Sequence, residues 1–186
     1  MLKLADILSY YPTHIHEWHE VDILKEYLQY FVLDSIFQSP LGKEMCFIWG
    51  TALRLLYNNQ RFSEDLDFDN TWISFEQFAT LQETIRYQFS LHGVECEFTP
   101  TQDDAYHLRV KIPWMLYNEW LSSYEDQKIK IRIDTHDQWL SYAYEKLLSK
   151  KFEIGRVINV APLSVLMAMK IITIPNRKRA KGRDYY

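Results

Sequence analysis

The chain has 186 residues, of which 47% are apolar and 25% charged, and its formal net charge is −4. This length allows one domain or one and a half with a sizeable core, and the net negative charge argues against a protein that coats nucleic acid with its whole surface. Two cysteines, Cys46 and Cys96, exclude a disulfide framework and a zinc-finger spacing. No apolar run approaches the roughly 20 residues of a membrane span, and the start lacks a signal-peptide pattern. We therefore expect a cytoplasmic protein that does not contact the membrane.

The first half of the chain predicts helices that alternate with strands. Apolar residues recur at helical spacing in the longest segments, and short continuous apolar runs are typical of buried strands. In chain order, the expected elements are a helix over 22–37, a strand over 45–49, a helix over 51–57, a strand over 64–68 and a helix from Ser74 to Gly93.

The second half predicts three strands and then helices. The strands are expected over 94–98, 106–112 and 128–134, and the last of these alternates strictly between isoleucines and charged residues. Beyond Asp137 the pattern becomes helical, most clearly over 164–172. The order predicts an α/β (α+β) fold, a mixed sheet flanked by helices. We expect a core domain over 1–137 and a small helical region over 138–186.

Two aspartates in the strand over 64–68 form the first candidate site. Successive side chains of a strand point to opposite faces, so Asp65 and Asp67 share one face while Leu66 and Phe68 face the core. Two carboxylates about 7 Å apart along a strand can converge on a hard cation, and Mg²⁺ is often held by one or two carboxylates together with substrate phosphates. The alternative is a solvated strand end without a ligand.

Gly50 and Thr51 lie between an expected strand and an expected helix. A glycine there lets the backbone approach a phosphate closely, and a helix N-terminus offers free N–H groups to an anion. The Thr51 hydroxyl could add a donor. The alternative is a tight turn in which Thr51 is only the N-cap.

Asp134 offers a third carboxylate, because it ends the alternating strand on the polar face. Three carboxylates could hold two metal ions in a phosphoryl transfer, and Asp134 could also act as base for the incoming hydroxyl. The alternative is an ordinary aspartate at a strand end, with Asp137 as the next candidate.

The spacing of these motifs resembles a known superfamily. Gly50-Thr51, thirteen further residues and then Asp65-Leu66-Asp67-Phe68 resemble the signature of the DNA polymerase β-type nucleotidyltransferases. The strings GTALRLLY and RFSEDLDF are similar to those of the AbiEii/AbiGii toxins, the toxin half of type IV toxin–antitoxin pairs. Met169-Lys170 and the segment 181–186 resemble a later motif of the same family.

The resemblance implies a role for each matching residue. Asp65 and Asp67 would bind metal, Gly50 and Thr51 would hold the triphosphate, Arg61 and Ser63 would contact phosphate, Lys170 would neutralise phosphate charge, and Lys181 and Asp184 would complete the site. Two of these have simpler alternatives, because Arg61 could pair only with Glu64 and Lys170 could be a snorkelling helix residue.

The resemblance also implies the activity. It implies a nucleotidyltransferase fold that uses Mg²⁺, with two ions expected, and an NTP, and that adds a nucleoside monophosphate to the 3′ end of an RNA such as tRNA. An antitoxin would be the partner. Family members continue past the Arg-Asp motif, so we expect a shortened C-terminal part here. Five basic residues within 177–183 form a further candidate anion-binding feature.

Two other functions remain open from the sequence. A nucleotidyltransferase of the same superfamily could modify a small molecule such as an aminoglycoside, or a protein hydroxyl. A shortened, inactive relative could bind nucleotide or RNA without catalysis.

Overall fold

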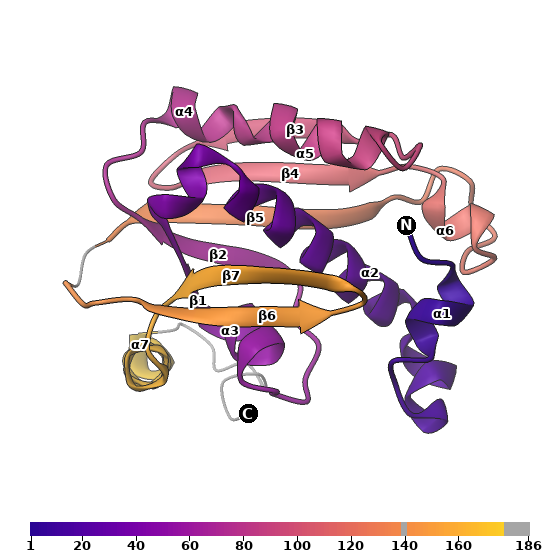
Figure 1. The fold of residues 1–186 in the computed structure, drawn as a ribbon, viewed down its shortest axis with the longest axis horizontal. Helices are drawn as coiled ribbons and strands as arrows, with labels where there is room; N and C mark the ends of the chain where they lie inside the picture. Colours follow the sequence, from indigo (N-terminus) through magenta and orange to yellow (C-terminus); the bar gives the residue numbers. More distant parts are fainter. Residues whose placement is uncertain (139–140, 177–186) are drawn as a thin grey trace.

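A computed structural model describes residues 1–138 and 141–176, with side chains to residue 173. Within these ranges the strands form one seven-stranded sheet of order β3-β4-β5-β2-β1-β7-β6 (Figure 1). The strands are β1 (Met45–Ile48), β2 (Asp65–Asn70), β3 (Glu97–Gln102), β4 (Tyr106–Ile112), β5 (Ile129–Asp137), β6 (Glu145–Lys151) and β7 (Ile154–Val160).

The predicted mixed sheet is confirmed. Strand β2 pairs parallel with β5 and antiparallel with β1, and β1 pairs parallel with β7. The pairs at both edges, β3–β4–β5 and β6–β7, are antiparallel. The aspartate-bearing strand β2 therefore lies in the middle of the sheet, where neighbours on both sides fix its position.

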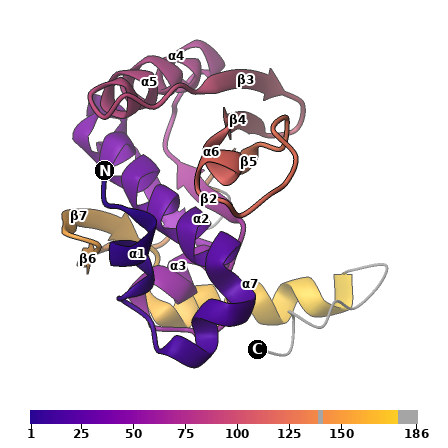
Figure 2. The ribbon, with the colours of Figure 1, turned by 90° about the vertical axis from the view of Figure 1, so that its right-hand side faces the viewer.

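Helices cover the sheet unequally. They are α1 (Leu4–Leu8), α2 (Thr13–Gln38), the 3₁₀ helix η1 (Pro40–Lys43), α3 (Trp49–Leu56), α4 (Phe75–Ala79), α5 (Leu81–Ser90), α6 (Met115–Asn118) and α7 (Leu163–Asn176). Helices α2 and α5 contact each other on one face of the sheet, whereas α7 contacts α3 and extends away on the opposite side (Figure 2). None of the helices described is long and apolar enough to cross a membrane.

The core lies between the sheet and helices α2 and α5. The isoleucines of β5 (Ile129, Ile131 and Ile133) are buried, while Lys130 and Arg132 between them are exposed. This is the alternation that the sequence predicts for a half-buried strand. The opposite face of β3, β4 and β5 carries polar side chains, and Figure 2 shows no helix of the described chain over it.

The predicted helical region beyond residue 138 is wrong for 145–160, where β6 and β7 form a hairpin that joins the sheet. Its two-residue turn places Phe152 and Glu153 at φ 53° and 63°, a conformation for which Asn-Gly is the usual signal. Phe152 is nevertheless buried, with its ring 4.9–6.2 Å from four tyrosine rings. The burial of Phe152 offsets the backbone strain of the turn. The turn can therefore form without the Asn-Gly sequence that usually indicates it.

Other predicted boundaries need smaller corrections. Helix α2 begins at Thr13 rather than at residue 22, and its backbone is interrupted at His19. The helix expected from Ser74 is two helices, of which α4 starts with a complete Ser74–Gln77 capping box. Strand β3 begins at Glu97 rather than at residue 94.

Candidate active site

The two aspartates of β2 lie on one face of the strand, as the period of two predicts. Asp65 and Asp67 are partly exposed, whereas Leu66 and Phe68 are fully buried. Thr51 of α3 and Arg132 of β5 flank them, the first through the Asp65 carbonyl and the second through the strand pairing. Both carboxylates are thus held by a central strand and reach the solvent side.

The turn before α3 differs from the expected glycine turn. The positive φ of 63° belongs to Trp49, and Gly50 is the second residue of the helix. A Cβ added at Gly50 would lie 3.3 Å from Ser63 Oγ and 3.7 Å from an Arg61 guanidinium nitrogen. The missing side chain therefore keeps the helix start close to the loop that carries Arg61 and Ser63.

Thr51 connects α3 to β2. Its side chain is fully buried, its hydroxyl donates to the Asp65 carbonyl, and it lies 2.7 Å from Ser63 Oγ. Thr51 is the third residue of α3 and not its N-cap. The structure therefore gives the hydroxyl a positioning role beneath the aspartates, where the sequence predicted a donor to a ligand.

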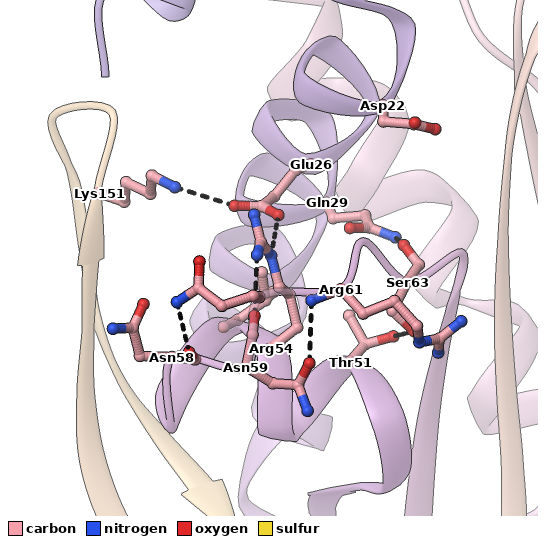
Figure 3. A network of polar contacts seen from close by, with 12 residues as sticks. Asp22, Glu26, Gln29, Thr51, Arg54, Asn58, Asn59, Arg61, Ser63 and Lys151 are labelled. Carbon is pink, nitrogen blue, oxygen red and sulfur yellow. Dashed lines mark hydrogen bonds and ion pairs between the residues drawn. The ribbon is translucent and has the colours of Figure 1, made fainter. Parts of the chain in front are cut away.

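Helix α2 fixes the loop that leads into β2 (Figure 3). The buried Gln29 side chain donates to the carbonyls of Ser63 and Glu64, each at 3.0 Å. The backbone N–H of Arg61 donates to Asn59 Oδ1 at 2.9 Å. Glu64 lies 3.9 Å from Lys25, so the alternative in which Arg61 pairs with Glu64 is not what the structure shows.

A buried network of ion pairs and hydrogen bonds supports the same loop (Figure 3). Glu26 of α2 accepts from Arg54 Nε at 2.6 Å and from Lys151 Nζ at 3.0 Å. Arg54 also donates to the Asn59 carbonyl at 2.8 Å and lies over the Phe62 ring. Three elements, α2, α3 and β6, thereby hold the loop between α3 and β2.

Asp134 lies directly beside Asp67, because these residues are partners in the parallel β2–β5 pairing. Asp134 as a residue is only 3% exposed. Its carboxylate accepts hydrogen bonds from His107 Nδ1 at 2.7 Å and from Arg132 Nε at 2.6 Å. Among the residues that the structure describes, no three His, Cys, Asp or Glu side chains are arranged to hold a metal ion. A metal-ligand role for Asp134 stays a prediction, since both its oxygens already have donors.

The partners of Asp134 have shifted pKa values. Burial lowers the pKa of His107, but the hydrogen bonds that its ring makes to Asp134 and Asp103 outweigh burial and raise the pKa above its usual range. The hydrogen bond to Asp134 raises the pKa of Arg132, with smaller contributions from Asp65 and Asp67. This face of the sheet therefore alternates acidic and cationic groups over short distances.

One cavity of about 290 Å³ brings most of the predicted residues together. Its lining includes Gly50, Arg61, Ser63, Asp65, Asp67, Arg132 and Lys170. Lys170 comes from α7, more than 100 residues after the aspartates in the sequence. The predicted residues Lys181 and Asp184, like the basic segment 177–183, lie outside the described residues.

A second cavity, of about 570 Å³, adjoins the first at Trp49. Its lining is acidic, with Asp69, Asp103, Asp104 and Asp137 together with His136. Burial raises the pKa of Asp69, although its hydrogen bond from Tyr142 acts in the opposite direction. The two cavities thus differ in charge, because the first also contains Arg61, Arg132 and Lys170.

The donor set of the first cavity fits magnesium. Mg²⁺ prefers carboxylate oxygens and is commonly bound by one or two of them, with substrate phosphates completing its shell. Asp65 and Asp67 supply such oxygens to the cavity lining, and Arg61, Arg132 and Lys170 add cationic side chains suited to phosphate. The chemistry of these side chains therefore suits an ion bound together with a triphosphate.

Three positioning residues were missed from the sequence: Arg132, His107 and Gln29. Arg132 precedes Asp134 by two residues on the same polar face, a signal that could have drawn attention to it. His107 and Gln29 act across strands and helices, and nothing in their local sequence indicates it.

Solved structures of other proteins share this fold. The structure is similar to MenT4, a nucleotidyltransferase toxin of Mycobacterium tuberculosis H37Rv, with TM-score 0.68, 20% identity, and coverage of 100% of this chain and 63% of that one. It is also similar to JHP933 from Helicobacter pylori, with TM-score 0.58, 15% identity, and coverage of 89% and 63%. The chain thus spans less than two thirds of these proteins, and the likeness shows the fold.

No curated protein matches the sequence. Residues 32–186, most of the chain, match the family described as nucleotidyl transferase AbiEii toxin, type IV TA system. The chain therefore belongs to the AbiEii nucleotidyl transferase toxin family.

Proposed function

We propose that the chain transfers a nucleoside monophosphate from an NTP to a hydroxyl group of RNA, as the toxin of a toxin–antitoxin pair. The observation that carries this proposal is the first cavity, where two carboxylates on a central strand share the lining with Arg61, Arg132 and Lys170. Family membership supports the reaction class and implies an antitoxin partner.

The cavity residues divide the work of binding a triphosphate. Asp65 and Asp67 would hold magnesium, which would supply neutralisation of phosphate charge. Arg61 and Lys170 pair with phosphate oxygens, and the first turn of α3 at Gly50 adds backbone N–H groups. Ser63, next to Arg61, is a further donor to phosphate.

In the proposed step, the acceptor hydroxyl oxygen bonds to the α-phosphorus. The bond from this phosphorus to the oxygen bridging the β-phosphate breaks, and pyrophosphate leaves with that electron pair. The hydroxyl proton passes to solvent water at the cavity. Asp134, the base expected from the sequence, does not line this cavity, and its two oxygens already accept from His107 Nδ1 and Arg132 Nε. His107 Nε2 lies 2.9 Å from the exposed Asp103, which connects this group with solvent.

A second acceptor class has one observation in its favour. The larger cavity beside Trp49 is acidic and would attract a cation rather than a phosphate backbone. A polycationic small molecule such as an aminoglycoside fits that charge. We rank it below RNA because the cationic side chains lie on the open sheet face next to the aspartates.

The test supplies each α-³²P-labelled NTP, magnesium and total RNA to the purified protein, with parallel reactions that contain an aminoglycoside or a protein extract. We expect label on RNA, and Asp67→Asn should remove it. Asp126→Asn, which changes an exposed aspartate outside the cavity, should label RNA as the unmodified protein does.

Label on the aminoglycoside or on protein would replace RNA as the acceptor while keeping the reaction class. The absence of label from every acceptor, with NTP binding intact, would favour the inactive relative. Equal labelling by the Asp67→Asn variant would remove the proposed site itself.

A further inference from the structure

The open face of the sheet carries two rows of cations beside the candidate site. Arg132 of β5 is the pairing partner of Asp65 on β2 and of Arg109 on β4. One step along the strands, Lys130 of β5 pairs with Lys111 of β4. Because every second residue shares a face, all four cations project from the same face as the catalytic aspartates. Neighbouring strands are about 4.8 Å apart, so the β4 cations begin about 10 Å from β2.

Pairing like charges across strands costs stability. Like charges directly opposite each other are destabilising, whereas opposite charges are favourable. Both pairs here, Arg109 with Arg132 and Lys111 with Lys130, combine like charges. Acidic residues offset part of this cost, since Glu97 on β3 is the partner of Lys111 and Asp65 on β2 is the partner of Arg132. Arg109 has no acidic partner on either neighbouring strand, and a bound anion would remove the remaining repulsion.

Two of the four cations are available to a ligand. Arg109 and Lys130 are exposed, and within the described part of the chain neither forms a hydrogen bond or an ion pair. Arg132, by contrast, is held by Asp134 and lines the first cavity. On β3, Glu97 lies directly opposite Lys111 and forms an ion pair with Lys128 at 2.6 Å. On β3, Thr99 lies opposite Arg109 and offers a hydroxyl donor.

Positive and negative side chains lie toward opposite ends of this face. The four cations lie toward the start of β5, whereas the acidic cavity with Asp103, Asp104 and Asp137 lies toward its end. The candidate aspartates lie between these two regions. A polyanion approaching the site is therefore attracted from one side and repelled from the other, although the chain as a whole is acidic.

We infer that Arg109, Lys111 and Lys130, continuing from Arg132, form a phosphate-binding track for the single-stranded 3′ end of the RNA acceptor. This inference rests on the proposed function and adds the path by which the acceptor reaches the site. Phosphate contacts position a nucleic acid without reading its sequence, so the track sets the direction of the strand.

The test measures binding of a fluorescently labelled 12-nucleotide single-stranded RNA by anisotropy at several salt concentrations, without NTP or magnesium. The variant Lys111→Gln/Lys130→Gln should bind at least tenfold more weakly at low salt. Its plot of log affinity against log salt concentration should be flatter, by about 0.7 for each phosphate contact removed. Arg109→Gln should show a smaller effect in the same direction.

The matched control is Lys146→Gln/Lys150→Gln. It removes two exposed lysines from β6, the strand at the opposite edge of the sheet. Its affinity should stay within about twofold of that of the unmodified protein. Thermal melting checks the fold of both variants, and the loss of like-charge repulsion should keep the melting temperature of the track variant unchanged or raise it. Equal weakening by both variants, or none by either, would overturn the track.

The track and the proposed reaction can fail separately. Asp67→Asn should lose transfer but bind RNA at least as tightly as the unmodified protein. RNA labelling together with unaltered binding by the Lys111→Gln/Lys130→Gln variant would disprove the track and keep the reaction. Track-dependent binding without any transfer to RNA would keep the track and disprove RNA as the acceptor.

Discussion

Asp67 and Asp134 are direct partners on two adjacent parallel strands, yet their carboxylates lie in different surroundings. Asp67 lines the cavity and is partly exposed, whereas Asp134 is buried and accepts hydrogen bonds from His107 and Arg132. The sequence predicted Asp67 as a metal ligand and Asp134 as a third ligand or base, with an ordinary strand-end aspartate as the alternative for Asp134. These surroundings favour Asp67 over Asp134 as a ligand in the proposed metal site, because Asp67 lines the cavity and Asp134 does not.

This difference predicts separate effects of two isosteric variants. Asp67→Asn should abolish transfer and change the free energy of unfolding by less than about 0.5 kcal/mol, as for a partly exposed site. Asp134→Asn should cost about 1–3 kcal/mol, because it weakens two hydrogen bonds that involve charged groups. Urea denaturation of both variants measures this. Equal stability of the two would contradict the buried network around Asp134.

Substitution of Gly50 should weaken NTP binding while the fold is kept. In Gly50→Ala the new methyl group would lie 3.3 Å from Ser63 Oγ and near Arg61. We expect stability to change by less than about 1 kcal/mol, because alanine favours the helix by a similar amount. NTP affinity should fall at least tenfold, as measured by calorimetry. Gly155→Ala, at a glycine with nothing within 4 Å of the added carbon, is the control that should bind NTP normally.

The network around Glu26 predicts a large loss of stability away from the aspartates. Glu26→Gln leaves the buried Arg54, 9% exposed in its side chain, and Lys151 without a counter-charge. Removing one partner of a buried ion pair costs about 3–5 kcal/mol, and the midpoint of urea denaturation should fall accordingly. Glu83→Gln breaks the exposed pair with Arg86 and should cost less than about 1 kcal/mol. Similar costs for both would disprove the buried network.

The β6–β7 turn predicts opposite effects at neighbouring residues. Phe152→Ala removes a buried ring in contact with four tyrosines and should cost about 3–5 kcal/mol. Glu153→Gly should raise stability by up to about 1 kcal/mol, because this exposed residue has φ 63° and glycine adopts that conformation freely. Thermal unfolding measures both, and destabilisation by Glu153→Gly would argue against the strained turn.

Strand periodicity and motif spacing were sufficient to predict the centre of the fold. Asp65 and Asp67 share a face because side chains alternate along any strand, and the buried β1 and the alternating β5 were equally visible. Strand β4 was predicted with its observed bounds. The spacing of Gly50-Thr51 and the aspartates indicated the family, which the match over residues 32–186 confirms.

The turn at Trp49 and the β6–β7 hairpin could not be read locally. Both place large side chains at positive φ, where propensity predicts glycine or asparagine. Burial of Phe152 among aromatic rings supplies the compensating free energy at the hairpin, and this burial involves α2 and the segment just after α1, far away in the sequence. Local propensity cannot include a gain that arises only on packing.

By itself, then, the sequence determined the features that arise from short-range periodicity: a strand that presents two acids on one side, and a helix with a glycine at its start. Only the tertiary structure decided which distant groups surround them. It placed Lys170 of α7 in the cavity lining and paired Arg109 with Arg132 across adjacent strands. It also brought Arg132 and His107 within hydrogen-bond distance of Asp134. Such contacts depend on strand register and helix packing, which the whole chain fixes together and no single segment encodes.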